Sequence, residues 1–429
     1  MKFSILTLGC KSNQAESGQI ESLFERNDNQ KVPIEDSPDV CIINTCSVTA
    51  KSDYESRQLI RRAVKSGARV FVTGCYSELN EAQVKDLSND ICLIKNDDKL
   101  SYFNGGATPG VSGGATPYVS GGKTPGTLNT SRGRALVKIQ DGCDCRCTYC
   151  IIPHARGNSR SRPIAEITDE LRDLEELHGY NEAVLTGIHV GFYGLDLTPI
   201  RKLADLVRHI LTNTTRIRIR ITSVEANEVT DELIELFKEP RVCSHIHVPL
   251  QSGDDNILIK MERHYTTEFY RAVIERLFSA VDNISIGTDI IVGFPGETEE
   301  SFSKTHGFIS SLPLTYLHVF PYSKRKYTKA GLYPGHLDKS VKKQRAAILR
   351  EHSALIKGRY MERQIGRTLP AVVENRFQGD GQCYHLTTDN YLKAAATVTE
   401  KELSKKCLVN LRVTGVDRGV LLGEPVSDL

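Results

Sequence analysis

Three times in the first hundred residues, an apolar strand-like run ends in a cysteine and is followed by a helical pattern. The three runs cover residues 2–10, 39–46 and 69–75. Strands that alternate with helices predict a parallel sheet, and ligands bind at the edge where the carboxyl ends of such strands meet. We therefore expect Cys10, Cys46 and Cys75 to converge there as a three-thiolate site. The alternative is that they are small core residues, which is our interpretation of Cys41 and Cys92.

A longer alternating region runs from residue 134 to residue 363. Its strand candidates are residues 135–139, 182–185, 216–221, 245–248, 284–292 and 316–320, and helical stretches such as 164–178 and 267–279 separate them. Six strand–helix units of this length predict a partial (β/α)6 barrel, whose active site lies at the carboxyl ends of the strands. A cysteine-rich loop follows the first strand, where this rule places an active site.

That loop holds Cys143, Cys147 and Cys150 in a CxxxCxxC pattern. Short loops between thiolates suit a 4Fe-4S cube, which the three cysteines would bind while the fourth iron stays open. A structural zinc site needs a fourth ligand, and Cys145 or His154 is near enough in sequence to serve. A disulfide cluster is disfavoured, because the apolar run at the start of the chain is too short for a secretory signal. The spacing therefore favours an iron–sulfur site.

Two changes of composition divide the chain. Residues 105–128 repeat an eight-residue unit rich in Gly, Thr and Pro three times. Such a repeat buries too little apolar surface to offset its ordering, and we expect a disordered spacer. From residue 364, short strand-like runs at 368–374, 391–397, 407–414 and 419–423 predict a small β-barrel. The fold class is therefore α/β, with expected domains at residues 1–103, 134–362 and 363–429 and a linker at 104–133.

The net charge of +2 indicates neither strong nucleic-acid affinity nor an acidic partner. Because no window reaches the apolar length of a membrane helix, we expect a soluble, cytoplasmic protein without membrane contact. Twelve cysteines in such a chain indicate metal or redox chemistry rather than structural bridges.

With both cysteine sets in view, the chain resembles the radical-SAM (S-adenosylmethionine) methylthiotransferase family over essentially its whole length. The resemblance is carried by residues 8–17, 44–49, 73–75, 142–153, 247–253 and 293–297 and by Met261, Arg263 and Tyr265. The C-terminal barrel is similar to a TRAM domain, the RNA-binding module of these enzymes. Residues 8–17 and 47–53 look most like the branch that acts on threonylcarbamoyl-adenosine in tRNA.

The resemblance implies two 4Fe-4S clusters and SAM as cofactors. Cys143, Cys147 and Cys150, the barrel cysteines, would hold the cluster that binds SAM and releases a 5′-deoxyadenosyl radical. Cys10, Cys46 and Cys75, the auxiliary cysteines, would hold a second cluster that carries a sulfur. One SAM methylates this sulfur, and the radical from another removes the hydrogen at C2 of an adenine, which methylthio replaces. Cys145 is expected to be dispensable.

The resemblance also indicates residues that contact SAM. These candidates are Tyr149, Thr186, Gly187, Glu225, Gln251 and Arg263, with Ser252, Gly253 and the turn at 293–297 beside them. Some of them have an ordinary alternative: a surface tyrosine for Tyr149, a structural salt bridge for Glu225 and Arg263, and a Pro-Gly turn for residues 293–297.

Between residues 324 and 367 the chain has 13 Lys or Arg but only three Asp or Glu. The apolar residues of this stretch share one helical face, which leaves the cations outward. A charge run is often only a solvated surface, but one this one-sided suits phosphates. The expected RNA contacts are Lys342, Lys343 and Arg345 here, and Arg156, Arg160 and Arg162 after the cysteine loop.

The expected function is therefore insertion of a methylthio group at C2 of N6-threonylcarbamoyladenosine, with the tRNA anticodon stem-loop as partner. Alternatives are isopentenyladenosine in tRNA or an aspartate of a ribosomal protein as substrate. A different class, an inactive RNA-binding paralogue, stays open if the auxiliary cysteines bind no iron. The reaction implies an electron donor such as flavodoxin or ferredoxin, while the sulfur donor is not identified by the sequence.

Overall fold

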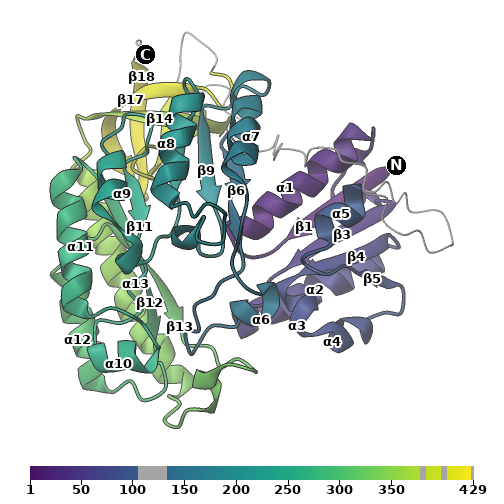
Figure 1. Ribbon diagram of the computed structural model, residues 1–429, viewed down its shortest axis with the longest axis horizontal. Helices are drawn as coiled ribbons and strands as arrows, with labels where there is room; N and C mark the ends of the chain where they lie inside the picture. The colour runs from purple at the N-terminus through teal and green to yellow at the C-terminus, as the bar shows by residue number, and fades with distance from the viewer. Residues whose placement is uncertain (105–132, 377–382, 398–402, 427–429) are drawn as a thin grey trace.

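The computed structural model describes residues 1–104, 133–376, 383–397 and 403–426. Figure 1 shows three parts, with an N-terminal sheet at the right, a larger strand–helix region at the left and a strand-rich part at the top. The repeat at 105–128 lies outside the described residues, so its role as a spacer stays a prediction. The exact domain boundaries stay predictions as well.

The N-terminal part is a parallel sheet with helices on both faces. Its strands are β1 (Lys2–Thr7), β2 (Gln30–Lys31), β3 (Val40–Thr45), β4 (Arg69–Gly74) and β5 (Ile91–Leu93), in the spatial order β2-β1-β3-β4-β5. The helices are α1 (Lys11–Arg26), α2 (Ala50–Lys65), α3 (Cys75–Leu79), α4 (Glu81–Lys85) and α5 (Lys99–Asn104), with a short 3-10 turn, η1 (Ile34–Asp36).

Alternate residues of the central strands face opposite sides of this sheet. Ile42 of β3 packs in a core with Phe24 of α1 and Phe103 of α5. Its neighbour Ile43 packs in a second core with Ile60 of α2. Burial on both faces explains why these strands are almost continuously apolar. Cys41 is fully buried in the second core, as its apolar surroundings predict.

Six parallel strands form the partial barrel predicted for the middle of the chain. They are β6 (Ala135–Lys138), β9 (Glu182–Thr186), β10 (Arg218–Ile221), β11 (His245–His247), β12 (Ser285–Val292) and β13 (Tyr316–Pro321). They pair as β10-β9-β6 and β11-β12-β13, and isolated parallel bridges from Ile219 to Val242 and from Ser223 to His247 connect the two sheets. The prediction of six strand–helix units is thus confirmed.

Helices cover the outside of these strands (Figure 1). They are α7 (Ile164–Glu176), α8 (Leu203–Asn213), α9 (Asp231–Leu236), α10 (Asp255–Lys260), α11 (Thr267–Ala280), α12 (Glu299–Ser310) and α13 (Lys339–Glu362). Short elements between them are β7 (Gln140–Asp141), α6 (Ile152–Arg156), β8 (Arg160–Ser161), η2 (Val190–Phe192), η3 (Ala226–Glu228) and η4 (Lys329–Leu332). Thr230, Thr266 and Thr298 start α9, α11 and α12 by accepting a hydrogen bond from a backbone N–H three residues on.

The C-terminal part is a closed β-barrel in the order β14-β15-β16-β18-β17. Its strands are β14 (Thr368–Arg376), β15 (Cys383–Thr388), β16 (Lys393–Thr397), β17 (Leu408–Asp417) and β18 (Val420–Val426). The sequence predicted only four strands and missed β15. In this strand Tyr384 and Leu386 point into the core while His385 and Thr387 alternate with them, so no continuous apolar run marks it.

A fully buried ion pair joins the C-terminal barrel to the strands of the central part. Arg220 of β10 lies 2.7 Å from Glu182 of β9, and neither side chain is exposed. The same guanidinium donates hydrogen bonds to the carbonyl oxygens of Thr388 at 2.9 Å and Asp389 at 2.7 Å. The hairpin between β15 and β16 is therefore fixed against the barrel strands.

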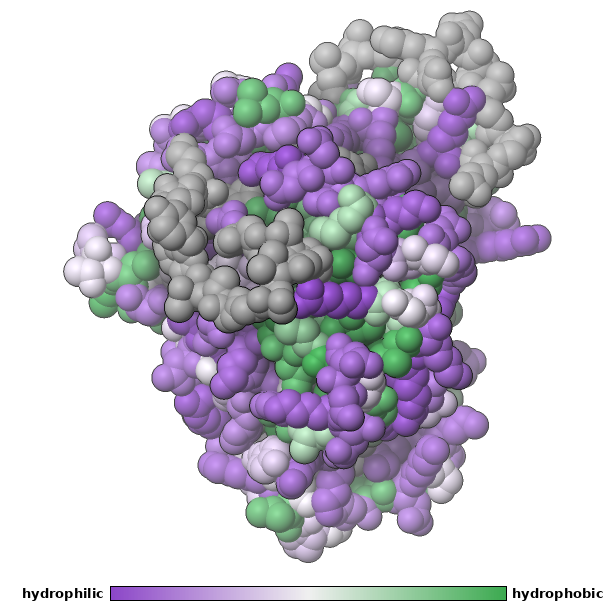
Figure 2. Space-filling model, turned by 90° about the vertical axis from the view of Figure 1, so that its right-hand side faces the viewer, coloured by the Kyte–Doolittle hydropathy of each residue, from purple (hydrophilic) through white to green (hydrophobic). Residues whose placement is uncertain are grey.

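The surface of the molecule is mostly hydrophilic on the side that Figure 2 shows, with one gathering of hydrophobic residues near its centre. This is the side on which the N-terminal sheet lies in Figure 1. Among the described residues, no helix is both long enough and apolar enough to cross a membrane.

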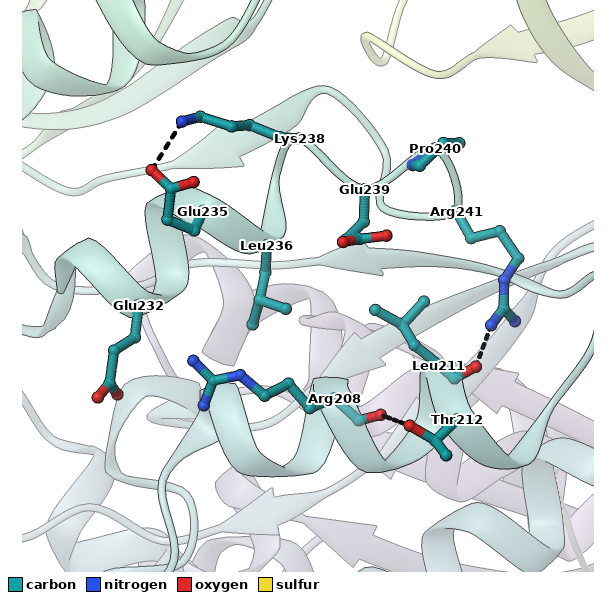
Figure 3. A pocket seen from close by; sticks show the side chains of 10 residues that line it. All are labelled: Arg208, Leu211, Thr212, Glu232, Glu235, Leu236, Lys238, Glu239, Pro240 and Arg241. Carbon is teal, nitrogen blue, oxygen red and sulfur yellow. Dashed lines mark hydrogen bonds and ion pairs between the residues drawn. The ribbon is translucent and has the colours of Figure 1, made fainter.

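Arg220→Ala should strongly destabilise the protein. The substitution leaves Glu182 buried without its main partner, and loss of one member of a buried pair typically costs about 3–5 kcal/mol. The matched control is Lys238→Ala, which removes a half-exposed pair with Glu235 at 2.7 Å (Figure 3). Thermal unfolding followed by circular dichroism should show a large fall in midpoint for the first variant and almost none for the second. Equal unfolding midpoints in the two variants would contradict the role of Arg220 in fixing the C-terminal barrel against the central strands.

Candidate active site

A cavity of about 1150 Å³ lies between the N-terminal sheet and the carboxyl ends of the barrel strands. Its wall includes Cys10 and Cys46 from the first part, Thr186 and His247 from the barrel, and Tyr391 from the C-terminal barrel. Another hollow, of about 740 Å³, lies between α8 and the end of α9, on the outside of the strand–helix layer (Figure 3). The latter is lined by surface charges such as Arg208 and Glu232 and includes no cysteine. The first cavity is therefore the candidate active site.

The structure brings the auxiliary cysteines together at the carboxyl edge of the N-terminal sheet. Cys10 precedes α1, Cys46 follows β3 and Cys75 begins α3. Gly9 has a φ of +99°, and a Cβ placed there would come within 2.9 Å of the Cys46 sulfur, so only glycine allows this approach. Cys10 is exposed, whereas Cys46 and Cys75 are buried.

The barrel cysteines lie on a loop held by backbone contacts. Cys143 donates its N–H to the carbonyl oxygen of Gly157 at 3.0 Å, and Cys150 donates to that of Cys147 at 3.0 Å. Thr148 donates its hydroxyl to the Lys260 carbonyl at 2.9 Å, which ties the loop to α10. These bonds fix the backbone of the loop that carries the three thiols. Around this loop, the ligand atoms within 4.8 Å of one another are those of Cys143, Cys145 and His189.

His189 is a neighbour of this loop that the sequence did not indicate. Its Nδ1 lies 3.3 Å from the Cys143 sulfur and 3.7 Å from the Cys145 sulfur, and its Nε2 lies 2.6 Å from a carboxylate oxygen of Glu228. Burial lowers its pKa, but the hydrogen bonds to Cys145 and Glu228 outweigh this and raise the pKa of His189 to about 9. A lone histidine 46 residues from Cys143 gives no sequence signal of this contact.

Four SAM candidates lie at the cavity wall or near a barrel cysteine. Thr186 ends β9, Gly187 follows it, and both line the cavity. Arg263 donates to the Cys147 sulfur at 3.4 Å and is ion-paired with Glu225. The structural salt bridge that the sequence left as an alternative for Glu225 and Arg263 is thus present. Their contact with SAM stays a prediction.

The other SAM candidates differ in their surroundings. Tyr149 packs against Ile257, Met261 and Phe294 and is not a surface tyrosine. Gln251 is buried with a φ of +69°, and its N–H bonds to the Asp289 carbonyl at 2.8 Å. This left-handed conformation is costly for glutamine and persists only where its surroundings fix it.

Two segments expected at the site turn away from it. The Ser252 hydroxyl contacts that of Thr305 in α12 at 3.3 Å, and Gly253 packs against the backbone of the same residue. In the turn at residues 293–297, Gly293 donates its N–H to the Glu297 carboxylate at 2.9 Å. This turn is the ordinary Pro-Gly turn that the sequence left as an alternative.

The structure contradicts an RNA role for two arginines. Arg156 has no exposed side-chain surface, because it is paired with Glu16 and Asp141. Arg345 is buried at 2.5 Å from Glu297 and 2.9 Å from Glu299. Neither guanidinium can reach a phosphate, and both predictions were wrong because the acidic partners lie far away in sequence.

The remaining RNA candidates differ in exposure. Arg160 is half-exposed and paired with Asp97 at 2.7 Å, while Arg162 is mostly buried beside Glu170 at 2.7 Å. Lys342 and Lys343 line the cavity, where Lys342 is half-buried and Lys343 is exposed. Their contact with RNA stays a prediction.

A chain of polar side chains forms part of the cavity wall and was also missed. Tyr316 lies 2.8 Å from Nε2 of His245 and 3.1 Å from Nδ1 of His247. The other nitrogen of His247 lies 2.9 Å from Asp289, whose carboxylate is also 3.3 Å from His318. Burial lowers the pKa of His245 far below its usual value, which keeps that ring neutral. These residues come from three adjacent strands, so only the register of β11, β12 and β13 brings them together.

Family models match two separate stretches of the chain. Residues 137–309 match the Radical SAM superfamily, and residues 2–94 match the uncharacterized protein family UPF0004. The threonylcarbamoyladenosine tRNA methylthiotransferase MtaB of Bacillus subtilis is 36% identical over 423 residues, which cover 95% of this chain and 93% of that protein. The chain belongs to the radical-SAM methylthiotransferase family.

Relatives with other substrates match this methylthiotransferase almost as fully. The ribosomal protein uS12 methylthiotransferase RimO of Carboxydothermus hydrogenoformans is 32% identical and covers 100% of both chains. The tRNA-2-methylthio-N(6)-dimethylallyladenosine synthase of Thermotoga petrophila is also 32% identical, over 87% of this chain and 86% of that protein. A solved radical S-adenosylmethionine methyltransferase, TsrM of Kitasatospora setae, has the same fold with a TM-score of 0.55 and 14% identity, over 77% of this chain and 74% of that one.

Membership of this family settles the cofactors as SAM and two 4Fe-4S clusters. The chemistry of the residues fits them, because each cysteine set offers three soft thiols. Cys10 and Cys46 line the large cavity, while Cys147 and Cys150 line a smaller hollow of about 210 Å³. Zinc, the alternative from the cysteine spacing, is not the metal of this family. We therefore propose the barrel cysteines as ligands of the SAM cluster and the auxiliary cysteines as ligands of the second.

Cys143→Ala and Cys46→Ala should separate the two clusters. Each variant should lose about four of the roughly eight irons that two cubes contain. Cys143→Ala should abolish reductive cleavage of SAM, whereas Cys46→Ala should retain cleavage but lose sulfur insertion. Iron analysis and 5′-deoxyadenosine assays measure these losses. Loss of both activities in both variants would contradict two separate sites.

Cys145→Ala should keep SAM cleavage and full iron content. Its sulfur contacts His189 rather than completing the CxxxCxxC set. The same iron and 5′-deoxyadenosine measurements check this, and a variant without cleavage would show that Cys145 is a ligand.

Proposed function

We propose that this methylthiotransferase inserts a methylthio group at C2 of N6-threonylcarbamoyladenosine beside the tRNA anticodon. The observation that carries the proposal is the charge of the cavity wall. Its positive residues are Lys11, Lys51, Lys339, Lys342, Lys343 and Arg350, whereas Asp289 is its one acidic residue among the described ones. The threonylcarbamoyl group ends in a carboxylate, which a cationic wall favours, while an isopentenyl group is an uncharged hydrocarbon.

Lys342 is one of these cations, and its contacts connect it to the loop that carries Cys46. Its ammonium lies 3.5 Å from the carbonyl oxygen of Tyr322 and 5.9 Å from the centre of that ring. The next residue, Ser323, accepts a hydrogen bond at 3.1 Å from the N–H of Ala50, four residues after Cys46. The start of α13 is thereby held against the loop that carries an auxiliary cysteine.

Lys342 also packs on the backbone of Gly293, where a Cβ would come 2.1 Å from its side chain. The turn at residues 293–297 thus supports the lysine even though it does not itself line the cavity. This arrangement fixes the stem of Lys342 and leaves its ammonium at the wall.

When bound, the clusters and SAM supply the radical, the methyl group and the sulfur. The chain itself orients the reactants. Thr186 and Gly187 bring the end of β9 to the cavity, and Arg263 presents one N–H to the Cys147 sulfur while Glu225 holds its other side. The cavity wall is drawn from all three parts of the chain.

The polar chain from His245 to His318 suits recognition of the adenine ring. Burial raises the pKa of Asp289, but hydrogen bonds from His247 and His318 outweigh this, so the carboxylate stays ionised. Donors and acceptors fixed in one plane of strands can pair with ring nitrogens, and Phe320, which is partly exposed beside them, offers a stacking surface.

Two other substrates are outcomes of the same test. The apolar wall residues Val48 and Phe320 would also accept an isopentenyl group. A ribosomal-protein aspartate is an anion as well, so the cations alone do not separate it from threonylcarbamoyl-adenosine. The expected partners are tRNA and a one-electron donor such as flavodoxin or ferredoxin.

Cells that lack this gene should lose 2-methylthio-N6-threonylcarbamoyladenosine and accumulate its precursor without the methylthio group. Nucleoside mass spectrometry of total tRNA measures both species, and the gene on a plasmid should restore the product. Loss of the methylthio derivative of isopentenyladenosine instead would show that isopentenyladenosine is the substrate. An unchanged tRNA profile would point to a protein substrate or to an inactive paralogue.

Lys342→Met should weaken turnover of an anticodon oligonucleotide that carries threonylcarbamoyl-adenosine. Loss of a charge-assisted hydrogen bond costs roughly 1.5–3 kcal/mol, or about tenfold to a hundredfold in kcat/KM. The matched control is Lys324→Met, an exposed cation of the same basic stretch that does not line the cavity. Affinity for the same oligonucleotide with plain adenosine should be unchanged. An equal loss of that affinity would mean that Lys342 binds phosphate.

A further inference from the structure

One short helix connects a ligand of each cluster. Cys150 lies just before α6, and Arg156 is the last residue of that helix. The Nε–H of Arg156 donates to the sulfur of Cys75 at 3.4 Å, although Cys75 belongs to the N-terminal sheet, 81 residues away in sequence. A residue of the barrel part thus touches a ligand of the auxiliary cluster.

All five N–H groups of this guanidinium have a partner. Nη1 donates to Glu16 at 2.7 Å and to Asp141 at 2.9 Å. Nη2 donates to the other oxygen of Glu16 at 3.2 Å and to the side-chain oxygen of Asn13. With these four bonds in place, the planar group has no freedom to rotate, and Nε–H is directed at the sulfur.

The group around Arg156 carries one positive charge in excess. Lys99 and Lys138 also pair with Glu16, at 2.5 and 2.6 Å, so three little-exposed cations face the two carboxylates of Glu16 and Asp141. The half-exposed Arg160, 3.8 Å from Asp141, is offset by Asp97 at 2.7 Å. Burial would raise the pKa of Glu16, but its three cationic partners hold it well below the usual range. Both acids are therefore ionised, and the excess charge is buried beside Cys75.

We propose that Arg156 raises the reduction potential of the auxiliary cluster, through its hydrogen bond to the Cys75 sulfur and through its buried charge. Three thiolates outweigh the charge of the oxidised iron–sulfur core, so the group is anionic and becomes more so when it gains an electron. A hydrogen bond to a ligand sulfur and a nearby cation both stabilise the reduced form, and both are known determinants of cluster potential.

The barrel cluster has a counterpart with a different charge balance. Arg263 donates to the Cys147 sulfur at 3.4 Å, but Glu225 pairs with the same guanidinium. This pair is neutral, whereas the group around Arg156 keeps a positive charge. The two arginines therefore give the two clusters different reduction potentials, and the auxiliary cluster is the easier one to reduce.

The test is a potentiometric titration followed by electron paramagnetic resonance. Full-length protein with Cys143→Ala, Cys147→Ala and Cys150→Ala carries only the auxiliary cluster and gives its midpoint potential without overlap. Adding Arg156→Gln removes the charge and the hydrogen bond and should lower that potential. Arg156→Lys keeps the charge without the fixed Nε–H and should lower it less.

Arg160→Gln is the matched control. Arg160 lies 3.8 Å from Asp141 and is paired with Asp97, but it makes no contact with a cysteine. Its loss should leave the potential unchanged, so an equal shift in this variant would overturn the proposal. If Arg156→Gln keeps its iron and its potential and lowers only the unfolding midpoint, the proposal is overturned. Arg156 would then serve only to dock the N-terminal sheet on the barrel. Loss of auxiliary iron in both Arg156 variants would overturn the proposal in favour of a role in cluster assembly.

Discussion

The position of both cysteine sets depends on one buried carboxylate. Glu16, which lies in α1 within the motif at residues 8–17, is ion-paired with Lys99, Lys138 and Arg156 from three other elements. Removing any one of these ions would leave an uncompensated charge in nonpolar surroundings, which strongly destabilises the folded chain. Any arrangement that separates Glu16 from these partners is therefore far less stable. The N-terminal sheet is therefore fixed relative to the barrel, and the cavity between them has a defined shape.

A second buried ion pair fixes the C-terminal barrel in the same way. Arg220 and Glu182 sit on neighbouring strands, and the arginine reaches carbonyl oxygens of the hairpin whose turn contains Tyr391. That hairpin places the Tyr391 ring 4.4 Å from the His245 ring and 5.1 Å from the Lys11 ammonium. The wall of the cavity is thus complete only when all three parts of the chain are docked.

The basic residues that follow the last barrel strand have different roles. Arg345 neutralises Glu297 and Glu299, Arg325 pairs with Asp53 near the auxiliary loop, and Lys342 and Lys343 face the cavity. A count of charges along the chain treats them alike, since it carries no information about distant acidic partners. The geometry divides the same stretch into structural ion pairs and a cationic cavity wall.

The sequence by itself determined the elements and the cysteine sets, because these depend on near neighbours along the chain. Strand alternation predicted the parallel sheet and the six barrel strands, and the CxxxCxxC spacing marked Cys143, Cys147 and Cys150. It could not place Arg156 at the sulfur of Cys75, or assemble the chain from His245 to His318, because those contacts join residues on separate strands and domains. Only the tertiary structure decided them, since burial selects partners by position in space and not by distance in sequence.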